Sequence, residues 1–71
     1  MKQLVKRQLK KLEAIKTKYE MMRLDLVKEI NENPGSVFND NHRQEILKID
    51  KEIQKLDASI RSCKQTINSL F

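Results

Sequence analysis

A heptad repeat of apolar residues runs without interruption through the second half of the chain. Its members alternate three and four residues apart and are Ile46, Ile49, Ile53, Leu56, Ile60, Cys63, Ile67 and Leu70. An apolar period of about 3.5 residues places these side chains on one stripe of a helix, and that stripe needs a second helix to be buried. The second half is therefore predicted to be one helix of a coiled coil, and the fold depends on what lies opposite it.

The only proline and the only glycine of the chain, Pro34 and Gly35, stand together inside the polar segment 31–41. Proline disfavours helical backbone at the residue before it. The order of residues over 33–36, which is Asn-Pro-Gly-Ser, is typical of a type II turn. The segment is therefore predicted to be the loop between two helices.

These breakers divide the whole chain, residues 1–71, into one helical hairpin. We expect a first helix over about 2–31, a loop over about 32–40 and a second helix over about 41–70. Asp40 or Asn41 is expected to cap the second helix, because their side-chain oxygens can accept hydrogen bonds from the free amides of the first turn. The fold class is all-α.

The first helix carries an apolar stripe of its own, formed by Val5, Leu9, Leu12, Ile15, Tyr19, Met22, Leu26 and Ile30. If the helices run antiparallel, facing residues have numbers with a constant sum. A sum of 75 aligns the two stripes over Val5–Leu70, Leu12–Cys63, Ile15–Ile60, Tyr19–Leu56, Met22–Ile53 and Leu26–Ile49, with Gln8 opposite Ile67. The chain is therefore predicted to fold back on itself.

Charged residues beside the stripe support the same antiparallel alignment. Edge positions on one side of the seam face each other with a sum of 73, which brings Arg23 opposite Asp50 and, one heptad further, Lys16 opposite Asp57. A parallel dimer formed by the second helix alone would instead place carboxylates of the two copies next to each other. We therefore expect an antiparallel two-helix coiled coil, completed by dimerisation into a four-helix bundle or by a partner protein, because one hairpin buries little apolar surface.

A second set of apolar residues lies off the stripe and toward the loop. Such a patch is typical of a docking surface, for a second copy or for a different protein. The alternative is that Val37 and Phe38 fold over the end of their own hairpin. The predicted protein-binding residues are Met21, Leu24, Val27, Val37, Phe38 and Leu47.

Basic residues are concentrated at the two ends of the chain. Residues 1–18 contain seven basic residues and one acidic residue, a net charge of +6, and residues 58–71 add two basic residues. Residues 19–57 contain nine acidic and six basic residues, a net charge of −3. A hairpin places both basic segments at one end, where an anionic partner or nucleic acid could bind. The candidate contacts are Lys2, Lys6, Arg7, Lys10, Lys11, Arg61 and Lys64.

Enzyme chemistry is not expected from this sequence. The only cysteine, Cys63, lies in the apolar stripe, and the only histidine, His42, has no second base or nucleophile near it in sequence. We expect no catalytic residues, no metal site, no cofactor and no small-molecule substrate. No apolar run reaches the roughly 20 residues of a membrane span, and a single thiol suits a reducing compartment, so a cytoplasmic protein is expected.

The sequence therefore favours a non-enzymatic protein-interaction module, which would be a small helical-hairpin adaptor, assembly factor or chaperone subunit. Its expected partners are a second copy of itself, another protein, or both. The alternative function is a basic helical-hairpin dimer that binds nucleic acid through its lysine-rich N-terminal segment.

Overall fold

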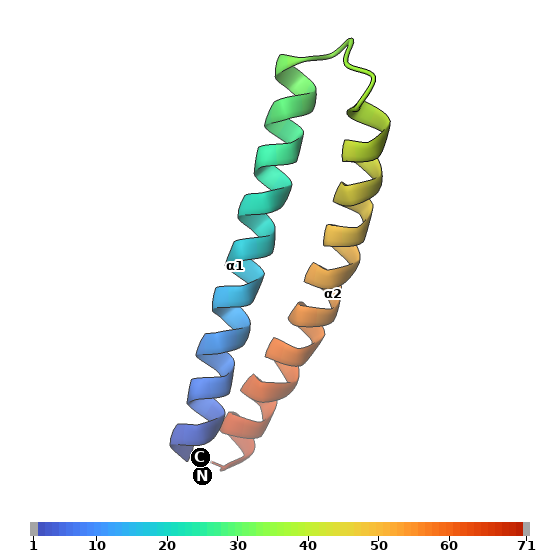
Figure 1. The fold of residues 1–71 in the computed structure, drawn as a ribbon. Helices are drawn as coiled ribbons and strands as arrows, with labels where there is room; N and C mark the ends of the chain where they lie inside the picture. Colours follow the sequence, from blue (N-terminus) through green and yellow to red (C-terminus); the bar gives the residue numbers. More distant parts are fainter. Residues whose placement is uncertain (1, 71) are drawn as a thin grey trace.

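The chain forms two long α-helices joined by a short loop (Figure 1). A computed structural model describes residues 2–70, with side chains described for residues 3–69. Helix α1 spans Lys2–Glu32 and helix α2 spans Asn39–Leu70. The helices run antiparallel, so both ends of the chain lie at the same end of a rod that measures 53 by 14 by 12 Å between its Cα atoms. The predicted all-α hairpin is confirmed.

The heptad stripe of α2 faces α1 as predicted. Ile49 and Ile60, which are 4% and 7% exposed, are the two buried apolar residues of the described chain, and the other described members of the stripe are half-buried. The side chain of Leu70 lies outside the described part. Two helices alone therefore give a narrow core, with most of the stripe covered on only one side.

The stripe of α1 differs from the prediction at two positions. Ile15 and Met22, which were expected in the seam, are 43% and 42% exposed. The partly buried residues that do follow a heptad on α1 are Val5, Leu9, Leu12, Lys16, Tyr19, Leu26 and Ile30. Helix α1 is thus turned about its axis, away from Ile15 and Met22 and toward the side that carries Lys16.

Two ion pairs connect the helices on the side toward which α1 is turned, and they confirm the predicted charge pairing. Lys16 Nζ lies 2.6 Å from Asp57 Oδ1, and Arg23 Nε donates to Asp50 Oδ1 over 2.7 Å. The hydrogen bond to Asp57 raises the pKa of Lys16 above its usual 10.5. This stabilisation is fully present below that usual value and is lost as the pH rises through the raised pKa of the folded state.

Reversing one member of the Arg23–Asp50 pair is expected to destabilise the hairpin. Arg23→Asp or Asp50→Arg alone should lower the free energy of unfolding by about 1 kcal/mol, because each places like charges together at a half-exposed site. The double reversal should recover part of this loss, with a coupling energy of about 0.5–1 kcal/mol in urea unfolding. Lys51→Asp, a charge reversal at an exposed position of α2, serves as the control. Additive single effects would contradict the pairing.

Helix α2 begins at Asn39, earlier than predicted, so the expected caps Asp40 and Asn41 are wrong. The first helical hydrogen bond runs from the His42 amide to the Phe38 carbonyl, 3.0 Å away. The hydroxyl of Ser36 accepts a hydrogen bond from the Phe38 amide over 3.2 Å, which satisfies one amide at the start of the helix. The Ser36 hydroxyl, and not Asp40 or Asn41, thus accepts a hydrogen bond from an amide at the start of α2.

The turn lies at the predicted residues but has a different type. The Ser36 amide donates to the Asn33 carbonyl over 3.1 Å, which closes a turn around Pro34 and Gly35. A type II turn requires positive φ at its third residue, and Gly35 does not have it. The prediction of a type II turn is therefore wrong, and the backbone here does not require glycine.

Gly35→Ala is accordingly expected to stabilise the protein. A Cβ atom at this position meets no atom within 4 Å, and the φ angle is one that alanine adopts. The free energy of unfolding should rise by about 0.4–1 kcal/mol, because alanine restricts the unfolded chain. Thermal unfolding followed by circular dichroism at fixed protein concentration measures this change. A lower midpoint would show that the loop needs the freedom of glycine.

Candidate protein-interaction surface

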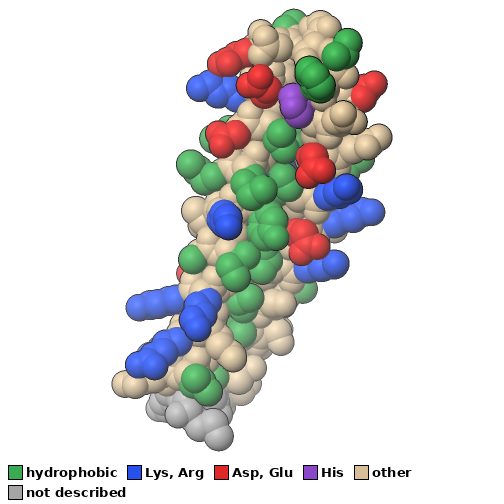
Figure 2. Space-filling model, viewed as in Figure 1, with side chains coloured by type: hydrophobic (Ala, Val, Ile, Leu, Met, Phe, Trp, Pro, Cys, Tyr) green, Lys and Arg blue, Asp and Glu red, His purple; other side chains and the backbone are tan. Residues whose placement is uncertain are grey.

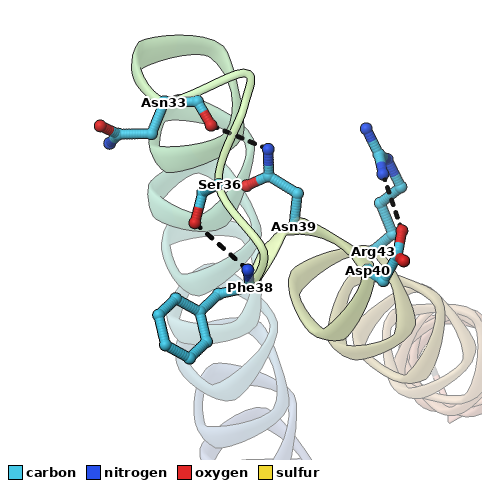
Figure 3. A network of polar contacts seen from close by, with 6 residues as sticks. All are labelled: Asn33, Ser36, Phe38, Asn39, Asp40 and Arg43. Carbon is cyan, nitrogen blue, oxygen red and sulfur yellow. Dashed lines mark hydrogen bonds and ion pairs between the residues drawn. The ribbon is translucent and has the colours of Figure 1, made fainter.

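The loop is held in place by a small network of polar contacts (Figure 3). Asn39 is 3% exposed, and its side-chain Nδ2 donates to the backbone carbonyl of Asn33 over 2.8 Å. At the start of α2, Arg43 forms an ion pair with Asp40 at 3.1 Å. In Figure 3 the ring of Phe38 points away from this network. The network therefore fixes the backbone that carries Phe38 without using its side chain.

The two apolar loop residues are turned toward solvent. Val37 is 85% exposed and Phe38 is 62% exposed. They do not fold over the end of their own hairpin, which was the alternative interpretation of the sequence. The backbone of Phe38 is thus held by the Ser36 hydroxyl while its ring is exposed.

Further apolar side chains lie on the outer sides of both helices, near the Arg23–Asp50 ion pair. Leu24 follows Arg23 directly and Leu47 precedes Asp50 by about one helical turn, so the ion pair brings both leucines to the same level of the rod. Both are exposed. Met21, also exposed, lines a shallow hollow together with Leu24, beside Thr17, Glu20 and Arg23.

We call the predicted protein-binding residues, taken together, the loop-end surface. Five of them are exposed, and Val27 is half-buried. The structure brings Met21 and Leu24 together in one hollow, and it places Val37 and Phe38 next to each other on the loop. The loop-end surface consists of Met21, Leu24, Val27, Val37, Phe38 and Leu47.

The basic segments meet at the end of the rod opposite the loop. Lys6, Arg7 and Lys10 line a second shallow hollow on α1, and the antiparallel alignment brings Lys64 of α2 to the level of Lys10. Lys11 and Arg61 are also exposed, and the side chain of Lys2 lies outside the described residues. On the face seen in Figure 2, the end that carries the chain termini shows lysine and arginine, whereas carboxylates gather nearer the loop.

Residues 2–70 contain no group of three or more His, Cys, Asp or Glu that could hold a metal ion. Cys63 is a half-buried free thiol. Two buried polar atoms at the start of α2, Oδ1 of Asn39 and Nδ1 of His42, have no hydrogen-bond partner among the described residues. Within the same residues, neither helix is long and apolar enough to span a bilayer.

Comparison with family models, curated protein sequences and solved structures finds no match to this chain.

Two features of the structure were not found from the sequence. The first is the burial of Asn39, because the sequence predicts a polar loop at this position. The second is the exposure of Ile15 and Met22. The second feature had a signal, because Lys16 and Arg23 occupy the heptad positions of Leu9 and Ile30, and both carry long aliphatic stems that can cover a seam.

Proposed function

We propose that this chain is a non-enzymatic protein-interaction module, a small adaptor, assembly factor or chaperone subunit that binds a protein partner through the loop-end surface. The observation that supports this most directly is the exposure of Phe38 and Val37 on a loop whose backbone is held by Asn39 and Ser36. Exposed apolar side chains that cluster on a small protein mark interaction sites. The free thiol suits a reducing compartment, which supports a cytoplasmic location.

The surroundings of the loop-end surface suggest the chemistry of its partner. Residues 19–57, which include the whole surface, carry a net charge of −3. A partner that offers an apolar groove with a basic rim would bury Phe38 and Leu24 and meet complementary charge around them. Electrostatic attraction of this kind mainly raises the association rate, so we expect binding to weaken at high salt.

Site-specific photo-crosslinking tests this proposal. A photoreactive amino acid in place of Phe38, in the cells that make the protein, is expected to form an adduct with a discrete protein. The same group in place of Gln65, an exposed residue near the opposite end of α2, should not form that adduct. The double variant Leu24→Glu, Leu47→Glu should lose it. The proposal fails if position 38 gives no adduct, or if both positions give the same one.

A second candidate function is nucleic-acid binding by the basic end. It is supported by the antiparallel arrangement, which adds Arg61 and Lys64 to the basic segment of α1. Fluorescence polarisation with generic DNA and RNA tests it, because contacts to phosphates must weaken steeply with salt. Absence of binding at low salt would reject this function. Binding would support it only if it is lost on the combined reversal to glutamate of Lys6, Arg7, Lys10 and Lys11.

A further inference from the structure

The two edges of the seam between the helices differ in how they are closed. One edge is covered by the ion pairs Lys16–Asp57 and Arg23–Asp50, and we call it the paired edge. Ile15 and Met22 lie on the other side of the α1 stripe, where they are 43% and 42% exposed. We call this second side the open edge, because apolar side chains of α1 remain uncovered there.

Shallow hollows between the helices mark the same edge. One hollow is lined by Met22, Asp25 and Leu26 of α1 together with Glu45 and Ile49 of α2. Figure 2 shows a nearly continuous stripe of hydrophobic side chains along the groove between the helices. The groove therefore exposes part of the core itself.

A second hollow lies nearer the basic end and is also lined by residues of both helices. Its lining residues are Gln8, Lys11 and Leu12 of α1 and Ser59 of α2. The two hollows thus stand on either side of Ile15 along the rod. At both places the open edge reaches residues of the seam, which are Leu12, Leu26 and Ile49.

The exposed area of the hairpin is large for its mass. The molecule has an accessible surface of 5802 Å², whereas a compact monomer of 8.4 kDa is expected to have about 4,600 Å². A face 53 Å long and two helices wide covers on the order of 1,000 Å², which is more than the roughly 800 Å² per partner of a stable interface. The face that carries the open edge is therefore large enough for a second copy.

Side-chain chemistry selects the orientation of that second copy. A parallel arrangement would stack α1 on α2 of the second copy, so that Met22 would meet Glu52 and Ile15 would meet Ser59. An antiparallel twofold arrangement stacks α1 on α1 instead. Ile15 then meets Met22 of the second copy, and the reverse contact forms by symmetry. Only the antiparallel arrangement covers the apolar residues with apolar residues.

The charge distribution favours the same orientation. The end that contains both termini carries net charges of +6 and +2 in its two segments, and residues 19–57 carry −3. An antiparallel dimer places each basic end beside the acidic half of the other copy, and it brings Lys11 near Asp25 twice. The like pair Lys18–Lys18 at the twofold axis opposes this, but it is one repulsive contact against the two attractive Lys11–Asp25 contacts.

We propose that two copies of this chain associate as an antiparallel dimer through the open edge, with α1 against α1 and Ile15 packed on Met22 of the second copy. The loop-end surface stays exposed at both ends of this dimer, since Leu24 and Leu47 flank the paired edge and Phe38 lies on the loop. The dimer is therefore independent of the proposed function.

Multi-angle light scattering over a concentration series tests the association. The wild-type chain should reach twice its mass of 8.4 kDa. In the double variant Ile15→Glu, Met22→Glu the dissociation constant should rise at least about 100-fold, because charges replace apolar contacts in both copies. The double variant Leu24→Glu, Leu47→Glu should remain dimeric. A wild-type chain that stays monomeric up to millimolar concentration overturns the proposal, and so does loss of the dimer in the loop-end variant alone.

Disulfide trapping tests the orientation and does not depend on the folding of the glutamate variants. With Cys63 replaced by serine, Lys18→Cys lies next to the twofold axis and should form a disulfide-linked dimer on mild oxidation. Thr17→Cys, on the outer side of α1, should not. In a parallel dimer the two copies of residue 18 are apart, so a dimer by light scattering that Lys18→Cys fails to trap would overturn the antiparallel arrangement.

Discussion

Ile49→Ala is expected to lower the free energy of unfolding by about 3 kcal/mol, the range found for removal of a buried isoleucine side chain. Ile49 is the most buried apolar residue described, at 4% exposure, and it lies opposite Leu26 next to the Arg23–Asp50 pair. A core this narrow has few neighbours that can move in to fill the space left by the missing carbons. Urea unfolding at fixed protein concentration measures the change.

Leu47→Ala is the matched control, because it removes a side chain of similar size from the same helix two residues earlier. Leu47 is exposed, and alanine has high helix propensity, so stability should change by no more than about 0.5 kcal/mol. Equal losses in the two variants would mean that Ile49 is no more buried than Leu47. A loss in Leu47→Ala alone would place the seam on the other side of α2.

Asn39→Asp is expected to be the second most damaging substitution, with a loss of about 2 kcal/mol at neutral pH. The change is isosteric, but it replaces the Nδ2 donor with an oxygen that faces the Asn33 carbonyl, at a site that is 3% exposed. A carboxylate at a helix N-terminus gains about 0.3–1 kcal/mol, which is smaller than the cost of burying it without its hydrogen bond.

The effect of Asn39→Asp should depend on pH in a defined direction. Burial beside a carbonyl raises the pKa of the new carboxyl in the folded state, so its protonated form is favoured there. Relative stability is then retained below the pKa of an unfolded aspartate, about 3.9, and is lost as the pH rises through the folded value. Asn41→Asp, in the same turn but exposed, should show no such loss. Identical pH profiles would contradict the burial of Asn39.

The hairpin could be predicted because its determinants are local or periodic. The heptad from Ile46 onward defines α2, the Pro34–Gly35 pair defines the loop, and charge matching selects the antiparallel alignment. Each of these features can be recognised from the types of residues and their spacing in the sequence. The ion pairs Arg23–Asp50 and Lys16–Asp57 confirm the alignment.

The rotation of α1 could not be predicted in the same way. Two overlapping stripes exist on this helix, one through Ile15 and Met22 and one through Lys16 and Arg23, and apolar counting prefers the first. The structure uses the second, since both ion pairs form there and Lys16 is half-buried. Ile15 and Met22 are therefore surface residues and not members of the seam.

The start of α2 was misplaced for a related reason. Several residues before it can cap a helix, and the sequence does not rank them. The choice depends on where the turn directs the chain, which brings the Ser36 hydroxyl to the Phe38 amide and the Asn39 side chain to the Asn33 carbonyl. Contacts between residues across the loop determine where the helix begins, so the composition of the segment alone does not predict that boundary.

The spacing of the two ion pairs also affects how well the helices find their correct alignment, which a heptad repeat by itself leaves ambiguous. Lys16 and Arg23 are seven residues apart, as are Asp50 and Asp57. Sliding one helix along the other by a full heptad would keep apolar residues facing apolar residues, so the hydrophobic stripes alone do not distinguish the correct alignment from its neighbours.

The charges make that distinction in both directions. A slip of one heptad toward the loop end of α2 would place Arg23 opposite Arg43, and a slip the other way would place Lys16 opposite Lys64. Each slipped alignment keeps one attractive contact and replaces the other with a repulsive one. The two surface ion pairs add little to stability. They nevertheless favour the correct alignment over the two slipped alignments of an otherwise repetitive hairpin.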